Sequence, residues 1–127
     1  MAQARIAPAE WAVMEVLWAK QPLSAAEVIE ALEGESDWHP KTIRTLLERL
    51  VQKGALSREK RAGCYRYAPL VERADCVREE GKSFLSRFFG GQLAPMVASF
   101  LDGEDVSREE IEELRRMLEK RKKEKKI

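Results

Sequence analysis

The chain has 127 residues, of which 44% are hydrophobic and 35% are charged, and its net charge is +1. This length is typical of one domain or of one domain with an extension, and no apolar run approaches the roughly 20 residues of a membrane helix. Because the first ten residues contain no hydrophobic signal segment, we expect a cytoplasmic protein without membrane insertion. Cys64 and Cys76 have no neighbouring Cys or His, which excludes a disulfide framework and a usual metal-ligand spacing.

The charge is unevenly distributed along the chain. Residues 1–35 contain two basic residues against six glutamates, a balance of −4. Residues 36–70 contain eight basic residues against three acidic ones, a balance of +5, and the remaining residues are balanced. Because the local excess of one sign determines which partners a surface attracts, the segment 36–70 is the candidate for binding a polyanion.

Three helices followed by a β-hairpin are predicted within the first 70 residues. Pro8 suits the first turn of a helix, where its missing N–H would have no partner. Ser24 and Glu27 form a capping-box pattern that begins a second helix, and Gly54 suits the end of a third. Gly63 supplies the freedom that a hairpin turn needs. The predicted elements are helices at 8–19, from Ser24 to near Gly34 and from Pro40 to just before Gly54, then strands at 55–60 and 64–68 around a turn at 61–63.

This order of elements is that of a winged helix-turn-helix, so we predict a mainly α fold with a small β-hairpin. After residue 70 the pattern changes to helical segments at 71–89, at 93–101 and from Ser107 onward, where Ser107 and Glu110 form another capping-box pattern. The charged tail at 119–127 is predicted to be a solvated helix end, and the alternative is that it adds nonspecific affinity for DNA.

The predicted third helix has an apolar face and a polar face. Its buried stripe consists of Ile43, Leu46, Leu47 and Leu50, which leaves the polar side chains exposed. Recognition helices contact base edges mainly from their N-terminal turns. The base-reading candidates are therefore Lys41, Thr42 and Thr45, and the phosphate-contact candidates are Arg44 and Arg49. The alternative is an ordinary solvated helix face.

The predicted hairpin is basic, with Tyr65 and Tyr67 interleaved. A wing of this kind contacts phosphates, which fixes the position of a protein on DNA without reading sequence. Its phosphate-contact candidates are Arg58, Lys60, Arg61 and Arg66. The alternative is a charged hairpin that protects its own edges.

The organisation that follows is a DNA-binding winged-helix domain at 1–70 and a helical dimerisation domain at 71–127. A small helical appendage usually buries its apolar faces against a second subunit, so we predict a homodimer through about residues 72–120. The candidate dimerisation residues are Phe84, Leu85, Phe88, Phe89, Met96, Val97, Phe100, Ile111, Leu114 and Leu118.

The remaining chemically interesting residues receive structural predictions. His39 precedes Pro40 and is expected to end a loop or cap the third helix, because no second metal ligand is nearby. Cys64 and Cys76 are expected to be small buried or half-buried hydrophobic residues. The sequence contains no Ser/His/Asp set, no paired-carboxylate motif and no glycine-rich phosphate loop. We therefore assign no catalytic residue, no metal and no cofactor.

Five segments in order resemble the penicillinase repressor family, the BlaI, MecI and CopY transcriptional repressors. They are AEWAVMEVLW at 9–18, Ser24-Ala25 with Glu27, PKTIRTLLERLVQKG at 40–54, KSFLSRFFGG at 82–91 and EEIEELRRML at 109–118. The resemblance implies a dimer that represses genes for β-lactam resistance or copper handling from palindromic operators. It implies TACA/TGTA half-sites, which would meet Lys41, Thr42, Arg44 and Thr45.

The resemblance also implies how the repressor is released from DNA. In the penicillinase branch a membrane sensor protease triggers cleavage in the dimerisation domain, and the corresponding bond here is Ser99-Phe100. The family has Asn where this chain has Ser99, and the alternative is that Phe100 and Leu101 are dimer core. The copper branch uses a C-terminal cysteine cluster, whereas this chain has no cysteine after Cys76.

We therefore predict a dimeric, sequence-specific transcriptional repressor. One alternative is a winged-helix module that binds another protein through its third helix. A second is an enzyme, against which the missing catalytic set argues. A third keeps DNA binding but makes the protein an activator or a sensor of another ligand.

Overall fold

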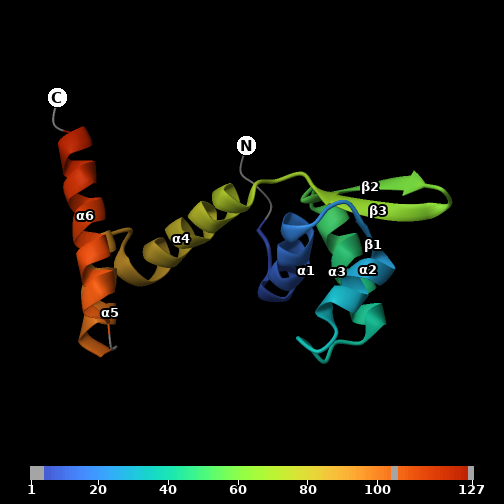
Figure 1. Ribbon diagram of the computed structural model, residues 1–127, viewed down its shortest axis with the longest axis horizontal. Coiled ribbons are helices and arrows are strands. Elements are labelled where there is room, and N and C mark those ends of the chain that lie inside the picture. The colour runs from blue at the N-terminus through green and yellow to red at the C-terminus, as the bar shows by residue number, and fades with distance from the viewer. Residues whose placement is uncertain (1–4, 104–105, 126–127) are drawn as a thin grey trace. The chain divides into compact units, whose positions relative to one another are not determined.

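The computed structural model describes residues 5–103 and 106–125 of the chain. Residues 104–105 and the last two residues of the predicted tail lie outside this description. The chain divides into two compact units, residues 1–80 and residues 81–127 (Figure 1). In chain order the elements are α1 (Pro8–Ala19), β1 (Leu23–Ser24), α2 (Ala25–Leu32), α3 (Pro40–Gln52), β2 (Leu56–Arg61), β3 (Cys64–Pro69), α4 (Arg73–Phe89), α5 (Leu93–Gly103) and α6 (Arg108–Glu124).

The first unit combines three helices with a small antiparallel sheet whose strand order is β1-β3-β2 (Figure 1). The predicted hairpin of β2 and β3 is present, and Lys60 pairs with Tyr65 across it. The sequence did not predict β1, in which Leu23 pairs with Tyr67. Two residues are too few to show the alternation of a strand, although both are buried. This short strand pairs with β3 and forms one edge of the sheet.

The core of the first unit forms where the helices meet. Met14 and Leu17 of α1 and Leu47 and Leu50 of α3 are completely buried. The predicted apolar stripe of α3 is confirmed, because Ile43, Leu46, Leu47 and Leu50 are its buried residues. Burial of this stripe turns the opposite, polar face of α3 outward.

Side chains cap the helices largely as predicted. The Glu27 amide donates to Ser24 Oγ at 3.2 Å, and the Ser24 amide donates to Glu27 Oε1 at 2.8 Å, which confirms the capping box of α2. His39 caps α3, since its Nδ1 accepts from the Lys41 amide at 3.0 Å. Ser107 Oγ accepts from the Glu110 amide at the start of α6.

The prediction for the two cysteines is right for Cys76 and wrong for Cys64. Cys76 is buried, whereas Cys64 is exposed. Cys64 begins β3 next to the hairpin turn, and the buried residue of that strand, Tyr67, lies three positions further on. The sequence pattern therefore predicted the strand correctly, but it did not predict that the first residues of the strand are exposed to solvent.

The start of α4 and the residues just before it belong to the first unit and contact α1. Trp18 Nε1 donates to the carbonyl of Val71 at 3.0 Å, and Arg73 forms an ion pair with Glu15. The division into compact units consequently falls inside α4, ten residues after the predicted domain boundary. The functions assigned to the two domains stay predictions.

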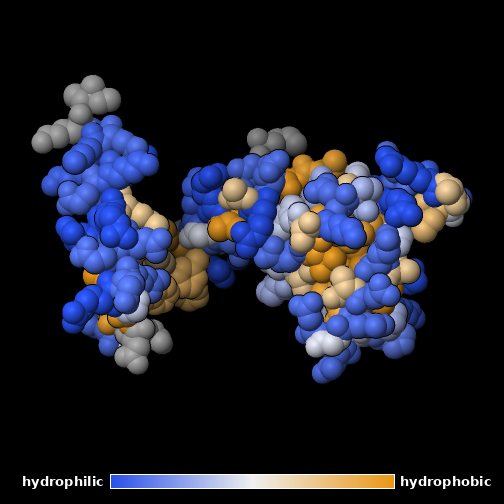
Figure 2. All heavy atoms as spheres, viewed as in Figure 1, coloured by the Kyte–Doolittle hydropathy of each residue, from blue (hydrophilic) through white to orange (hydrophobic). Residues whose placement is uncertain are grey.

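The second unit leaves much of its apolar surface uncovered. None of the described residues of α5 or α6 is buried. Phe88 and Leu118 are 62% and 65% exposed, and Figure 2 shows hydrophobic residues on the surface of this unit beside its hydrophilic ones. Among the candidate dimerisation residues, those exposed are Phe88, Phe100, Ile111, Leu114 and Leu118, and those partly buried are Phe84, Leu85, Phe89, Met96 and Val97.

Candidate nucleic-acid interface

The outward face of α3 presents the predicted reading residues to solvent. Lys41, Thr42, Arg44, Thr45 and Arg49 are all exposed. Within the described part of the chain, none of the three cations among them forms an ion pair. Their charges are therefore available to an external anion.

Thr45 has a defined orientation on this face. Its hydroxyl donates to the carbonyl of Lys41 at 3.0 Å, so its proton is used within the helix. The oxygen lone pairs and the methyl group remain. Thr45 can therefore accept a hydrogen bond from a base or pack against the methyl group of thymine.

The wing is a tight hairpin with a two-residue turn. Ala62 and Gly63 both have positive φ, at 51° and 79°, which suits a turn whose twist matches the flanking strands. Arg61, just before the turn, pairs with Cys64, just after it. The turn therefore projects Lys60 and Arg61 at the end of the wing.

Strand alternation divides the four candidate cations of the wing between two faces. Arg58 and Lys60 share a face with Tyr65, and their charged groups lie 4.7 and 5.8 Å from the centre of its ring. Arg61 and Arg66 lie on the other face. One DNA backbone cannot meet all four cations in the same way.

Two of these arginines already have carboxylate partners on the helices. Arg58 donates to both carboxylate oxygens of Glu48 on α3, which raises the pKa of Arg58 above its ordinary value. Arg66 lies 3.1 Å from Glu27 on α2. The amide hydrogen bond from Ser24, and to a lesser extent Arg66, lower the pKa of Glu27. These pairs connect the wing to the helices.

A shallow groove brings α3 and the wing together with the start of α2. Its volume is about 290 Å³. Arg44 lines it from α3, and Tyr65 and Tyr67 line it from β3. Arg44 therefore lies on the side of α3 next to the wing.

Sequence reasoning missed a charged pair behind this surface. Lys53 follows α3, and its Nζ lies 2.6 Å from Oε1 of the buried Glu10 and 2.9 Å from the carbonyl of Arg5. Glu10 Oε1 also accepts from the Ala7 amide. Neither contact of Glu10 was predicted from the sequence, and nothing local indicates Lys53, which is 43 residues away.

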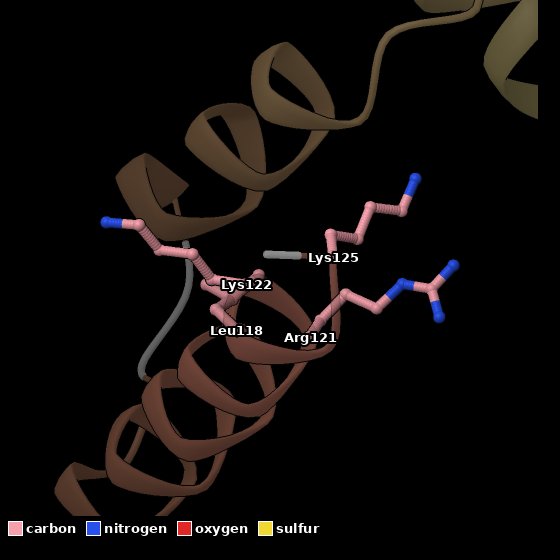
Figure 3. A pocket seen from close by; sticks show the side chains of 4 residues that line it. All are labelled: Leu118, Arg121, Lys122 and Lys125. Carbon is pink, nitrogen blue, oxygen red and sulfur yellow. The ribbon is translucent and has the colours of Figure 1, made fainter. Parts of the chain in front are cut away.

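Another cationic surface lies in the second unit. Figure 3 shows Arg121, Lys122 and Lys125 extending from the end of α6 around Leu118, where the four residues line an open hollow. These residues continue the exposed helix into the predicted charged tail. Nothing in this arrangement identifies a specific ligand.

The candidate cleavage bond lies in regular structure. Ser99 and Phe100 are consecutive residues of α5, and both are exposed. Across residues 5–103 and 106–125, no group of three His, Cys, Asp or Glu residues is placed to hold a metal ion. In the same residues, no helix is long and apolar enough to cross a membrane.

A helix with an exposed basic face beside a basic wing is the architecture of a winged-helix DNA-binding protein. The chain belongs to the penicillinase repressor family, since the model of that family, "Penicillinase repressor", matches residues 6–120. The fold class and the family predicted from the sequence are confirmed. Members of this family are transcriptional repressors and not enzymes.

The similar proteins span nearly the whole chain. The methicillin resistance regulatory protein MecI of Staphylococcus aureus strain N315 is 41% identical over 116 residues, covering 91% of this chain and 94% of MecI. The penicillinase repressor of Bacillus licheniformis is 42% identical over 122 residues, covering 96% and 95% of the two chains.

Two solved structures of a repressor are also similar. The DNA-binding domain of the repressor BlaI superposes with a TM-score of 0.53 and 39% identity, covering 58% of this chain and 90% of that domain. The monomeric form of BlaI from Bacillus licheniformis, in complex with the blaP half-operator, gives a TM-score of 0.50 and 41% identity. That match covers 56% of this chain and 87% of the BlaI chain.

Proposed function

We propose that this chain is a homodimeric repressor that binds a palindromic DNA operator through α3 and the wing. The observation that carries the proposal is the exposed face of α3, whose three cations have no ion-pair partner among the described residues. The similar BlaI structure contains a half-operator, which supports the same use of this fold. Repression follows because a bound dimer blocks access of the polymerase.

The residues of the interface have different roles in this proposal. Lys41, Thr42 and Thr45 contact base edges, because the N-terminal turns of a recognition helix enter the major groove. The phosphate contacts come from Arg44, Arg49, Lys60 and Arg61. Phosphate contacts set affinity and position, while base contacts set sequence preference.

Replacement of Arg44 and of Thr45 tests these roles separately. Arg44→Ala should weaken binding to all duplexes and reduce the slope of log affinity against log salt by about 0.9, the value for one phosphate contact. Thr45→Ala should leave that slope unchanged and relax the preference at one base position. Mobility shifts with a TACA/TGTA operator and its single-base variants measure both effects.

Arg115→Ala is the matched control, because Arg115 is a cation of α6 that pairs with Glu112 on the same helix. It should bind DNA as the wild-type protein does. Wild-type binding by both the Arg44 and the Thr45 variants would show that α3 does not read the operator.

The regulated genes and the inducing signal form the finer part of the proposal. The two similar proteins are named for methicillin resistance and penicillinase, so we infer that the targets are β-lactam resistance genes. A membrane sensor protease would act on the Ser99-Phe100 bond. Because this bond lies inside α5, the helix has to open before a protease can bind it in an extended form. Mass spectrometry after incubation with the sensor would detect the two fragments, and an uncleaved chain would remove this step.

A further inference from the structure

Glu48 is an acidic residue on the side of α3 that faces the wing. It lies one helical turn after Arg44 and Thr45, and its side chain is 46% exposed. A carboxylate near DNA repels the phosphate backbone, so it is unfavourable in a surface that binds a polyanion. A cation that neutralises this carboxylate would offset the repulsion.

The compensating contact is a clamp that joins three elements. Arg58 of β2 bonds both carboxylate oxygens of Glu48 on α3, and its guanidinium lies over the ring of Tyr65 on β3 at 4.7 Å. Arg58 is thus held from one side by a charge and from the other by an aromatic face. We refer to Glu48, Arg58 and Tyr65 as the wing clamp.

Lys60 provides the contrast within the same strand. It lies over the same ring at 5.8 Å, but it has no carboxylate partner among the residues that the structure describes. A phosphate can bind Lys60 without competing with a carboxylate. At Arg58 it has to compete with Glu48, which occupies Nη1 and already compensates the charge of the guanidinium. The two cations therefore differ in availability although they share one face of the wing.

From these contacts we propose that Arg58 is a positioning residue and not a phosphate contact, and that Glu48 determines specificity by holding Arg58 away from the DNA backbone. The inference rests on the proposed function, because it assigns roles within the same interface. The clamp fixes the position of the wing relative to α3. Lys60 and Arg61 therefore contact phosphates only when α3 lies in the major groove of the DNA. This couples a sequence-independent contact to the reading of bases.

The clamp should act on binding more than on folding. Exposed ion pairs contribute little to stability, and both side chains remain partly exposed. A Glu48→Gln variant keeps the shape of the residue and removes its charge. It should unfold thermally within a few degrees of the wild-type protein, which makes its DNA binding interpretable.

The first measurement compares operator DNA with a random duplex of equal length. Glu48→Gln should release Arg58, so its affinity for the random duplex should rise about two- to fivefold, the range expected for one exposed ion pair. Its salt slope on that duplex should steepen by about 0.9, corresponding to one added phosphate contact. The ratio of operator to random affinity should fall.

The decisive measurement is a double-mutant cycle with Arg58→Met, which keeps an apolar side chain against Tyr65. Arg58→Met should weaken operator binding but leave the salt slope on random DNA unchanged. In the Arg58→Met background, Glu48→Gln should no longer steepen the salt slope on random DNA, because no guanidinium is left to be released to a phosphate. Glu59→Gln is the matched control, because Glu59 is an acid of the same strand that faces Arg61 and not Arg58. Its effect should be the same with or without Arg58.

Three results would overturn the inference. One is a salt slope on random DNA that flattens by about 0.9 in Arg58→Met, as expected of a phosphate contact. Another is a salt slope that Glu48→Gln still steepens in the absence of Arg58, which would mean that the carboxylate acts by simple repulsion of DNA. The third is a wild-type protein that binds operator DNA no more tightly than a random duplex. That result would also contradict the proposed function, and it can be measured before any variant is made.

Discussion

Lys53 shows that a basic residue in this chain can serve the fold instead of a ligand. It belongs to the most basic segment of the sequence, yet its ammonium group neutralises Glu10, whose side chain is 1% exposed. Within the described residues, Glu10 Oε2 is buried without a hydrogen-bond partner. Lys53 is therefore the counter-charge that makes a buried carboxylate tolerable at the start of α1.

Removing that counter-charge should destabilise the first unit. Lys53→Met leaves Glu10 buried and unpaired, and the expected loss is about 2–3 kcal/mol, below the usual range for a fully buried pair because Lys53 is partly exposed. Urea denaturation followed by tryptophan fluorescence measures the free energy of unfolding.

The control for this prediction removes the carboxylate charge as well. In Glu10→Gln/Lys53→Met, the glutamine oxygen can still accept from the Ala7 amide, so the double variant should be more stable than Lys53→Met alone. Equal stability of the two variants would mean that the destabilisation comes from lost packing of the lysine side chain and not from the buried charge.

The residues that the sequence predicted well share a local cause. The buried stripe of α3 follows from helical periodicity, and the caps at Ser24 and His39 follow from their neighbours in the chain. The pairs Glu10–Lys53 and Glu48–Arg58 join residues 43 and 10 positions apart. Long charged side chains carry no pattern that identifies such partners, so the sequence indicated the surface but not which of its cations are already engaged.

At the scale of elements, the start of α2 combines a cap with a contact to the wing. Glu27 accepts from the Ser24 amide and from Arg66 of β3. The hydrogen bond from the Ser24 amide is the largest cause of the lowered pKa of Glu27, which lies below the ordinary value of 4.5 for this carboxyl. The same carboxylate therefore anchors both the helix and one strand of the wing.

The lowered pKa predicts a stability contribution that depends on pH. A carboxyl with a lower pKa in the folded state than in the unfolded chain stabilises the fold above its unfolded pKa. This contribution is lost as pH falls through the folded pKa. The wild-type protein should therefore be more stable than Glu27→Gln at pH 7, and the difference should shrink at pH 3. Urea midpoints at both values measure it.

Glu30→Gln is the matched control, since Glu30 is an acid of the same helix whose side chain forms no hydrogen bond or ion pair within the described residues. Glutamine can also occupy this position of a capping box, so Glu27→Gln isolates the charge and keeps the cap. A difference between wild type and Glu27→Gln that is as large at pH 3 as at pH 7 would contradict the role of the carboxylate charge.

At the scale of the whole molecule, the second unit leaves an apolar side of α6 exposed. Residues Ile111, Leu114 and Leu118 lie on one side of α6 and are 47%, 39% and 65% exposed. Exposed apolar surface of this extent marks an interaction site. Because cyclic two-fold dimers are the commonest oligomers, a second copy of the chain is the partner that we propose for this surface.

A charge placed on that side should separate dimerisation from DNA recognition. Leu118→Glu should lower the mass at micromolar concentration from dimer to monomer in sedimentation equilibrium. Its affinity for a single half-operator should be unchanged, because α3 and the wing belong to the first unit. It should lose the added affinity for a full operator, whose half-sites lie roughly 34–36 Å apart if the two-fold axis of the dimer matches that of the DNA.

Arg116→Glu is the control on the opposite side of α6, where the helical spacing places it about half a turn from Leu114 and Leu118. It should remain a dimer and bind the full operator. If Leu118→Glu also stays dimeric, the subunits meet through other surfaces. If the wild-type protein is a monomer at every concentration but still prefers the full operator, two copies associate only on DNA, and the apolar side of α6 needs another partner.

If monomeric Leu118→Glu also loses binding to the half-operator, the substitution damages the first unit, and the two units do not act independently.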